Sequence, residues 1–174
     1  DPDVISIFKN KCESNINGMA DYYKNVDKNT WTKIILGDSA KNNSIQPNSI
    51  NAMITSPPYG DSRTTVAYGQ FSRLSAQWID IFDDPNSASG IDNKLLGGKP
   101  IELLSDLLKS KYLNQVITKI KKKDIKRARD VFSFYIDLEK CLKQAYRILK
   151  KDAYFCIVIG NRLVKQVRIP TDFI

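Results

Sequence analysis

The chain contains stretches in which hydrophobic residues follow a helical spacing and shorter ones typical of strands. Apolar side chains recur at intervals of three and four in residues 4–24, 101–120 and 130–150, which predicts three helices. The same spacing over a shorter stretch predicts a helix at 71–81. Residues 83–100 combine glycine, proline and small polar residues, so they are expected to form loops.

Three short apolar runs predict strands, at residues 31–36, 50–55 and 153–159. The last run is almost uninterrupted, which is typical of a strand covered on both faces in a parallel sheet. A long predicted helix separates the second run from the third, and this order is that of a β-α-β crossover. The expected fold class is therefore α/β, with a sheet of mostly parallel strands flanked by helices.

Each predicted strand ends in a short polar segment. These segments are Gly37–Asp38, Ser56–Tyr59 and Gly160–Asn161. Ligands of open α/β sheets bind at the carboxyl ends of the strands. Three parallel strands would bring these polar ends together at one edge of the sheet, where they would form a single site.

The segment Ser56-Pro57-Pro58-Tyr59 is the rarest of the three. Two consecutive prolines end a strand and stiffen the loop, because each lacks an N–H group and has a fixed φ. Such a loop suits a planar substrate with an amino group, since it offers oxygen acceptors at the substrate's edge and an aromatic ring against its face. The alternative interpretation is a proline-stiffened turn with an ordinary core tyrosine.

The charge of the chain indicates an acidic partner. The 174 residues carry a formal net charge of +8 and have an isoelectric point near 9.3, so nucleic acid is the first candidate. Seven of the eleven residues at 119–129 are Lys or Arg, and cations at such a density can contact phosphates. A solvated, lysine-rich surface is the alternative. The candidate contact residues are Arg63, Arg73, Lys121, Lys122 and Lys123.

Composition excludes several other classes. The absence of histidine excludes His-based metal sites and Ser-His-Asp triads, and no metal site is predicted. Three widely spaced cysteines indicate reduced thiols. No apolar run approaches the length of about 18 residues that predicts a membrane span. With 42% hydrophobic and 26% charged residues, the chain fits one folded domain.

Together, the three strand ends and the long helix before the last strand resemble the amino-methylating DNA methyltransferases. The resemblance covers about residues 33–174, and the Ser-Pro-Pro-Tyr segment is its most specific part. It implies a Rossmann-like catalytic domain, S-adenosylmethionine as the methyl donor, and double-stranded DNA from which the target base is flipped out. It also implies a restriction–modification system and a cytoplasmic protein of bacterial or archaeal type.

The resemblance gives catalytic roles to the proline segment. Ser56 matches the residue that accepts a hydrogen bond from the target amino group, and the carbonyl of Pro57 matches the second acceptor. Pro58 completes the rigid pair, and Tyr59 matches the aromatic residue that stacks on the flipped base. Serine at the first position favours cytosine N4 over adenine N6 as the target.

The resemblance places Gly37 and Asp38 beside the methyl donor. The glycine-rich Phe-x-Gly-x-Gly loop that binds the donor in this family is, however, not formed by any of the eight glycines. We therefore interpret the chain as a fragment of a longer enzyme. The expected organisation is a single partial catalytic domain over 1–174, with its sheet core at 33–60 and 130–174 and a helical or loop insertion at 83–129.

Two other functions fit the sequence. One is a non-catalytic nucleic-acid-binding module that uses the basic stretch at 119–129. The other is an RNA or protein methyltransferase with a related tip. Relatives that act on proteins usually carry asparagine at the first position of the tip, so Ser56 disfavours that branch.

Overall fold

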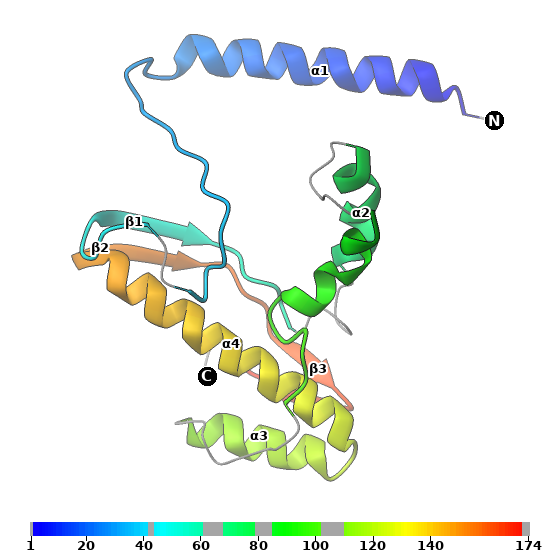
Figure 1. The fold of residues 1–174 in the computed structure, drawn as a ribbon, viewed down its shortest axis with the longest axis vertical. Coiled ribbons are helices and arrows are strands. Elements are labelled where there is room, and N and C mark those ends of the chain that lie inside the picture. The colour runs from blue at the N-terminus through cyan, green and yellow to red at the C-terminus, as the bar shows by residue number, and fades with distance from the viewer. Residues whose placement is uncertain (1, 42–43, 61–67, 79–84, 102–109, 172–174) are drawn as a thin grey trace. The chain divides into compact units, whose positions relative to one another are not determined.

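The computed structural model describes residues 2–41, 44–60, 68–78, 85–101 and 110–171, and for 85–89 it describes the backbone alone. The chain divides into two compact units, residues 1–36 and residues 37–174 (Figure 1). Each unit is described by itself.

The first unit contains the long helix α1, Val4–Asn25. Its N-cap is Asp3, whose carboxylate accepts hydrogen bonds from the backbone N–H of Ser6 at 3.1 Å and from the Ser6 hydroxyl at 2.6 Å. Such a cap satisfies N–H groups that have no partner inside the helix. The helix predicted at 4–24 is confirmed.

The strand predicted at 31–36 was wrong, because the structure forms no strand there. A strand depends on backbone hydrogen bonds to a neighbouring strand, so a hydrophobic run is not sufficient to make one. Both described sheets have two strands, and neither includes this segment. The side chains of Ile34 and Leu36 are 99% and 98% exposed. The part of the predicted sheet core that begins at Lys33 therefore lacks its first strand.

In the second unit, β1 (Ile50–Thr55) and β2 (Leu149–Ile157) form a parallel pair. Their register pairs Ala52 with Tyr154 and Thr55 with Ile157, so both carboxyl ends lie at the same edge. The helix α4, Ile125–Ile148, leads directly into β2. The predicted crossover between these two strands is therefore confirmed, as part of the predicted α/β sheet.

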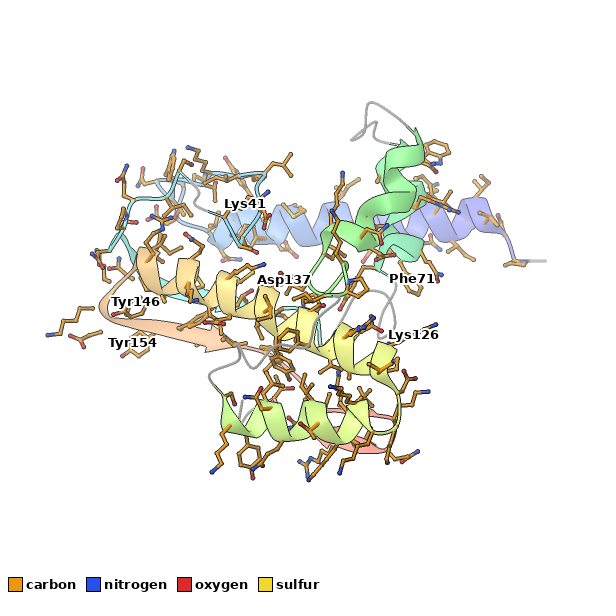
Figure 2. The ribbon with its side chains drawn as sticks, turned by 60° about the horizontal axis from the view of Figure 1, so that its bottom comes forward. Lys41, Phe71, Lys126, Asp137, Tyr146 and Tyr154 are labelled. Carbon is orange, nitrogen blue, oxygen red and sulfur yellow. The ribbon has the colours of Figure 1, made fainter. Side chains whose placement is uncertain are left out.

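The burial expected for the last strand was wrong. Tyr154 in β2 is 77% exposed and lies at the surface (Figure 2), and Ile54 in β1 is 80% exposed. A parallel strand becomes buried on both faces only when neighbouring strands and helices cover it. The described sheet has two strands, so much of its apolar surface stays in contact with solvent.

Three further elements connect β1 to α4: α2 (Tyr68–Trp78), the 3-10 helix η1 (Pro85–Lys94) and α3 (Lys111–Lys121). After β2 comes an antiparallel hairpin, β3 (Arg162–Val164) and β4 (Val167–Ile169). Its two turn residues, Lys165 and Gln166, have φ of 49° and 61°. Positive φ at both central residues is the pattern of a type I′ turn, which matches the twist of a hairpin.

The hydrophobic core lies between α3, α4 and the hairpin. Side chains from all three elements are completely buried, among them Ile120, Val131 and Ile169 at 0% exposure. The N-caps of the two helices are Ser110 and Asp124, which accept hydrogen bonds from Leu113 N–H and Arg127 N–H. The basic stretch at 119–129 covers the end of α3, the turn, and the start of α4.

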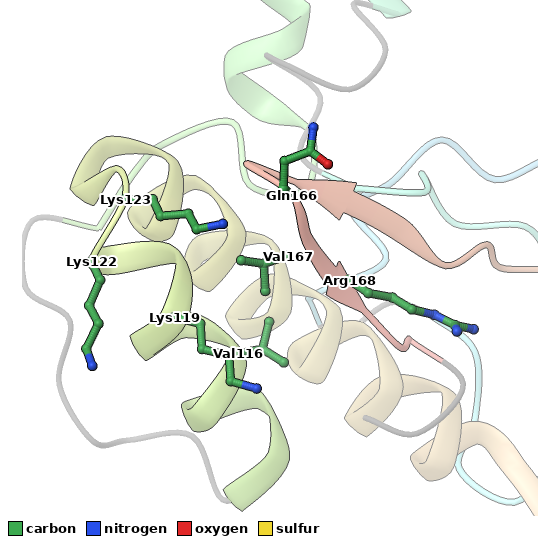
Figure 3. Close-up of a pocket in the computed structure, with 7 residues that line it drawn as sticks. All are labelled: Val116, Lys119, Lys122, Lys123, Gln166, Val167 and Arg168. Carbon is green, nitrogen blue, oxygen red and sulfur yellow. The ribbon is translucent and has the colours of Figure 1, made fainter.

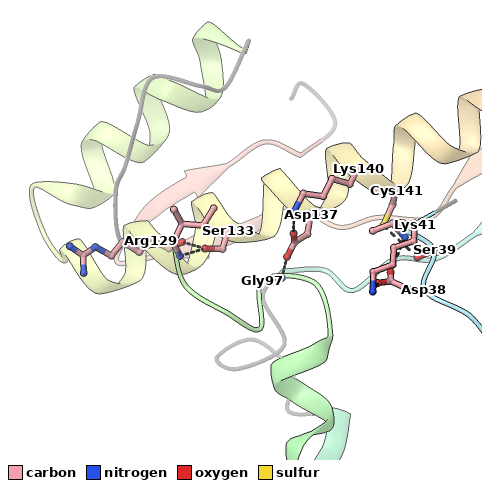
Figure 4. Close-up of polar contacts among 11 residues, drawn as sticks. Asp38, Ser39, Lys41, Gly97, Arg129, Ser133, Asp137, Lys140 and Cys141 are labelled. Carbon is pink, nitrogen blue, oxygen red and sulfur yellow. Dashed lines mark hydrogen bonds and ion pairs between the residues drawn. The ribbon is translucent and has the colours of Figure 1, made fainter.

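One face of α4 holds earlier segments of the chain by polar contacts (Figure 4). Ser133 accepts a hydrogen bond from Ile101 N–H at 2.7 Å, and Asp137 accepts one from Gly97 N–H at 3.1 Å. One turn further, the Cys141 sulfur lies 3.4 Å from the Ser39 hydroxyl. Positions four apart lie on one face of a helix, so a single row of side chains positions two separate segments, the one that contains Gly97 and Ile101 and the one that contains Ser39.

In the part of the chain that the structure describes, none of the helices combines the length and apolarity needed to span a bilayer.

The core predicts a large difference between two isoleucine-to-alanine substitutions. Ile120→Ala removes a side chain with 0% exposure and leaves a cavity, so it should lower the free energy of unfolding by about 2–5 kcal/mol. Ile125→Ala removes one that is 46% exposed, and its effect should stay below about 1 kcal/mol. Urea denaturation followed by circular dichroism measures both. Equal losses would contradict the core described here.

Candidate active site

The proline segment lies at the carboxyl end of β1. Val158 N–H donates to the Thr55 carbonyl at 2.9 Å, which continues the pairing of the two strands beyond β2. Immediately afterwards, the Ser56 hydroxyl donates to the Val158 carbonyl at 3.2 Å. The side chain of Ser56 is therefore held against the end of the neighbouring strand while the residue itself remains exposed.

This hydrogen bond makes the Ser56 oxygen an acceptor toward solvent. A hydroxyl has one proton and two acceptor lone pairs. Because the proton is directed to the Val158 carbonyl, the lone pairs remain available to an N–H donor. Pro57 and Pro58 follow without N–H groups of their own, so no backbone donor from these two residues competes with a ligand.

The Tyr59 ring lies beside Gly160, which follows the end of β2. A Cβ placed on Gly160 would lie 3.7 Å from Cγ of the Tyr59 ring, an ordinary contact distance. The ring thus has a side near the Gly160 backbone, while 44% of the tyrosine surface is exposed. Two of the three predicted polar strand ends, Ser56–Tyr59 and Gly160–Asn161, are therefore adjacent.

The third polar segment forms a turn of its own. The Asp38 carboxylate accepts a hydrogen bond from Ala40 N–H at 2.9 Å and pairs with Lys41 at 3.4 Å (Figure 4). The hydrogen bond from Ala40 N–H is the main cause that holds the pKa of this carboxyl below its usual value; burial opposes it, and Lys41 adds a smaller lowering. The charge of Asp38 therefore stabilises the turn above the ordinary pKa of an aspartate, and this stabilisation is lost as the pH falls through the lowered pKa.

The Asp38 turn is attached to α4 through its next residue. Ser39 and Cys141 are in contact at 3.4 Å, and burial raises the pKa of the Cys141 thiol, with the nearby carboxylates of Asp38 and Asp137 adding to the effect. Among the described residues, Gly37 and Asp38 form no hydrogen bond or ion pair with Ser56 or Tyr59. The structure thus brings two strand ends together and anchors the third segment on the helix.

The predicted nucleic-acid contacts lie in different places. Arg63 lies outside the described residues, and Arg73 is exposed on α2. Lys122 and Lys123 line a groove between α3 and the hairpin, whereas Lys121 is exposed on α3 and does not line it. The described residues contain no group of three or more acidic or cysteine side chains arranged to hold a metal ion.

Sequence reasoning missed two contacts of this site. The carbonyl of Val158, which orients Ser56, belongs to a residue that looked like one more apolar strand position. The sulfur of Cys141, which contacts Ser39, lies in a stretch where the helical spacing indicated a core residue. Parallel pairing of the strands would have predicted the first contact. Nothing in the local sequence indicates the second.

A known protein is similar to nearly all of this chain. The Type II methyltransferase M.MvaI of Kocuria varians is 40% identical over 186 residues, which cover 99% of this chain. The aligned part is 40% of the relative, so the chain spans less than half of that protein's length. No family model and no solved structure matches the chain. The predicted resemblance to methyltransferases thus agrees with a sequence similarity to one protein named as a Type II methyltransferase.

The environments of the cysteines predict different reactivities. Cys156 is exposed on β2. Cys141 lies on α4 and is partly buried, and burial raises the pKa of its thiol. Because the thiolate is the reactive form, iodoacetamide near neutral pH should modify Cys156 about tenfold faster or more. Peptide mass mapping over time measures this ratio, and labelling in urea, where the two should react alike, is the control. Faster modification of Cys141 would contradict its placement.

Proposed function

We propose that this chain carries the methyl-transfer part of an S-adenosylmethionine-dependent DNA methyltransferase that modifies the exocyclic amino group of a flipped base, with cytosine N4 favoured over adenine N6. The observation that carries the proposal is the Ser-Pro-Pro-Tyr tip at the carboxyl end of β1, beside the end of β2. The similarity to a Type II methyltransferase over 99% of the chain supports it independently.

The chemistry requires an amino group to act as a nucleophile although its lone pair is delocalised into the ring. Two oxygen acceptors placed on its N–H bonds favour a pyramidal nitrogen and direct the lone pair outward. The Ser56 oxygen, whose own proton is engaged by Val158, and the carbonyl of Pro57 are suited to these positions. The exposed Tyr59 ring offers a stacking surface for the base.

In this proposal the nitrogen forms a bond to the methyl carbon while the carbon–sulfur bond breaks and its electron pair stays on sulfur. The methylated nitrogen then loses one proton to solvent. S-adenosylmethionine supplies a methyl group already activated on a sulfonium, so the protein contributes mainly by positioning. No covalent enzyme intermediate is required.

The chain contains only some of the residues expected to bind S-adenosylmethionine. Asp38 is a half-exposed carboxylate, and a Cβ placed on Gly37 would meet nothing within 4 Å, so both are accessible to a ligand. They could form one edge of a donor site. The glycine-rich loop expected for the rest of that site is not in these 174 residues, so activity is best tested in the full-length protein.

Substitutions in the tip test the proposal. In the full-length protein, Ser56→Ala should lower the rate of methyl transfer to duplex DNA on the order of 100-fold, because one acceptor is lost and the amino group is misplaced. Tyr59→Ala should weaken transfer about ten- to a hundredfold through the loss of base stacking, and Tyr59→Phe should keep most of the activity. Transfer of labelled methyl groups measures all three.

DNA binding and product analysis provide the controls. Ser56→Ala should leave salt-sensitive binding to duplex DNA nearly unchanged, since the tip contributes little charge. Mass analysis of nucleosides should show N4-methylcytosine. N6-methyladenine would correct the target base, and RNA or protein as the methylated product would correct the substrate. Full methyl transfer by variants that lack Ser56 and Tyr59 would show that this tip is not the catalytic part. It would favour the alternative in which these 174 residues only bind nucleic acid.

The contact between Gly160 and Tyr59 gives a further test. Gly160→Ala should be tolerated, with methyl transfer within a few-fold of the wild type, because its Cβ would lie at an ordinary 3.7 Å from the ring. Gly160→Leu adds a branched side chain in the same direction and should displace the ring, so the rate should fall about as far as in Tyr59→Ala. Equal activity of the two Gly160 variants would show that the ring position is unimportant.

A further inference from the structure

A basic groove lies between the C-terminal half of α3 and the β3–β4 hairpin, with a volume of about 490 Å³ (Figure 3). The buried side chains of Val116 and Val167 form its floor. Four cations and one amide surround them, and no acidic residue lines the groove. The lining polar residues are Lys119, Lys122, Lys123, Gln166 and Arg168.

Most of this positive charge is not neutralised. Lys123 donates to the carbonyl of Lys165 at 3.0 Å, and the ammonium of Lys165 pairs with Asp124, also at 3.0 Å. Lys119, Lys122 and Arg168, in contrast, form no ion pair with any carboxylate of the described residues. Like charges gathered around one hollow raise the local potential and favour an anion.

The basic surface is extended along α3. A second, more open hollow of about 720 Å³ lies along the same helix and shares Lys119 and Lys122 with the groove. It adds Lys111, Gln115 and Thr118, which lie on one face because their spacing with Lys122 is three or four. From Lys111 to Lys122 the helix rises about 16 Å, which matches about five nucleotides of one DNA strand. A row of this length suits a polynucleotide backbone better than a single small anion.

The hairpin connects this surface to the candidate active site. Asn161 follows Gly160, the residue against Tyr59, and its side-chain oxygen accepts a hydrogen bond from Thr171 N–H at 2.7 Å. Thr171 also contacts the hydroxyl of Tyr135 in α4, at 3.1 Å. The base of the hairpin is therefore fixed, and the six residues from Asn161 to Gln166, joined by five Cα–Cα steps, span at most about 18 Å. The groove is therefore close enough to the Tyr59 ring for one short duplex to reach both.

We propose that this groove binds the sugar–phosphate backbone of duplex DNA beside the flipped base. Lys119, Lys122 and Arg168 contact phosphates, and the Gln166 amide donates to a phosphate or sugar oxygen. These contacts position the duplex and carry no sequence information. The inference rests on the proposed function, to which it adds the surface that holds the substrate.

A pair of charge-matched double variants tests the groove. Lys119→Gln/Lys122→Gln removes two of its cations. Lys150→Gln/Lys151→Gln removes two exposed lysines at the amino end of β2, opposite the edge that carries the tip. Lysine and glutamine have similar helix propensities, so α3 should remain folded, and circular dichroism checks this.

Fluorescence anisotropy with a duplex oligonucleotide, measured from 50 to 200 mM salt, compares the variants in the full-length protein. The groove variant should bind about tenfold or more weakly, and the slope of log affinity against log salt should fall by about 2, since each lost phosphate contact contributes about 0.9. The Lys150/Lys151 variant should change affinity less than about threefold. Arg168→Gln should lower the slope by about 1.

Three results would overturn the proposal: equal losses in the two double variants, displacement of the duplex by inorganic pyrophosphate at matched ionic strength, or tighter binding of duplex RNA than of duplex DNA. Methyl transfer separates this inference from the proposed function. The groove variants should raise the DNA concentration needed for half-maximal rate and leave the rate at saturating DNA unchanged. Ser56→Ala should do the reverse, so a failure of the groove proposal can be told apart from a failure of the proposed function.

Discussion

The row of polar side chains on α4 is the constraint on which the second unit depends. Ser133, Asp137 and Cys141 follow one another at intervals of one turn, and each contacts a backbone or side chain from a loop earlier in the chain. Ser133 is 1% exposed, so its hydrogen bond with Ile101 N–H is shielded from water. An N–H group without a partner in such a shielded place would be costly. At Gly97, φ of 69° turns the backbone so that its N–H can reach Asp137. Loss of helical geometry here would release both segments, the one at Gly97 and Ile101 and the one at Ser39, together.

Local sequence patterns predicted the helices and strands better than they predicted strand pairing and burial. The helices α1 and α4 and the strands β1 and β2 were expected because spacing and strand length are properties of a few neighbouring residues. The strand at 31–36 and the burial of β2 were wrong, since both depend on partners that a hydrophobic run does not specify. The β3–β4 hairpin was not predicted, because strands of three residues carry too little periodicity to be recognised.

The candidate site shows the same division. The proline segment was found from sequence because Pro-Pro constrains the backbone without help from other elements. Its contact with Val158, and the position of Tyr59 against Gly160, required the strand register. Lys119 and Arg168 belong to one basic surface only because the hairpin folds back on α3. Charge density alone predicted nucleic-acid contacts at residues 121–123, and of these Lys121 lies outside the groove.

The hairpin turn carries a conformational strain with a chemical consequence. Lys165 and Gln166 both adopt a left-handed backbone that costs non-glycine residues roughly 1–2 kcal/mol each, whereas Asn-Gly would adopt it readily. An Asn-Gly turn would, however, remove the ammonium that pairs with Asp124 and the amide at the groove's edge. The chain thus keeps two long polar side chains at a position where shorter residues would fold more easily. Backbone stability is opposed here to the retention of these two side chains, and engineering the turn for thermal resistance would alter the polar surface beside it.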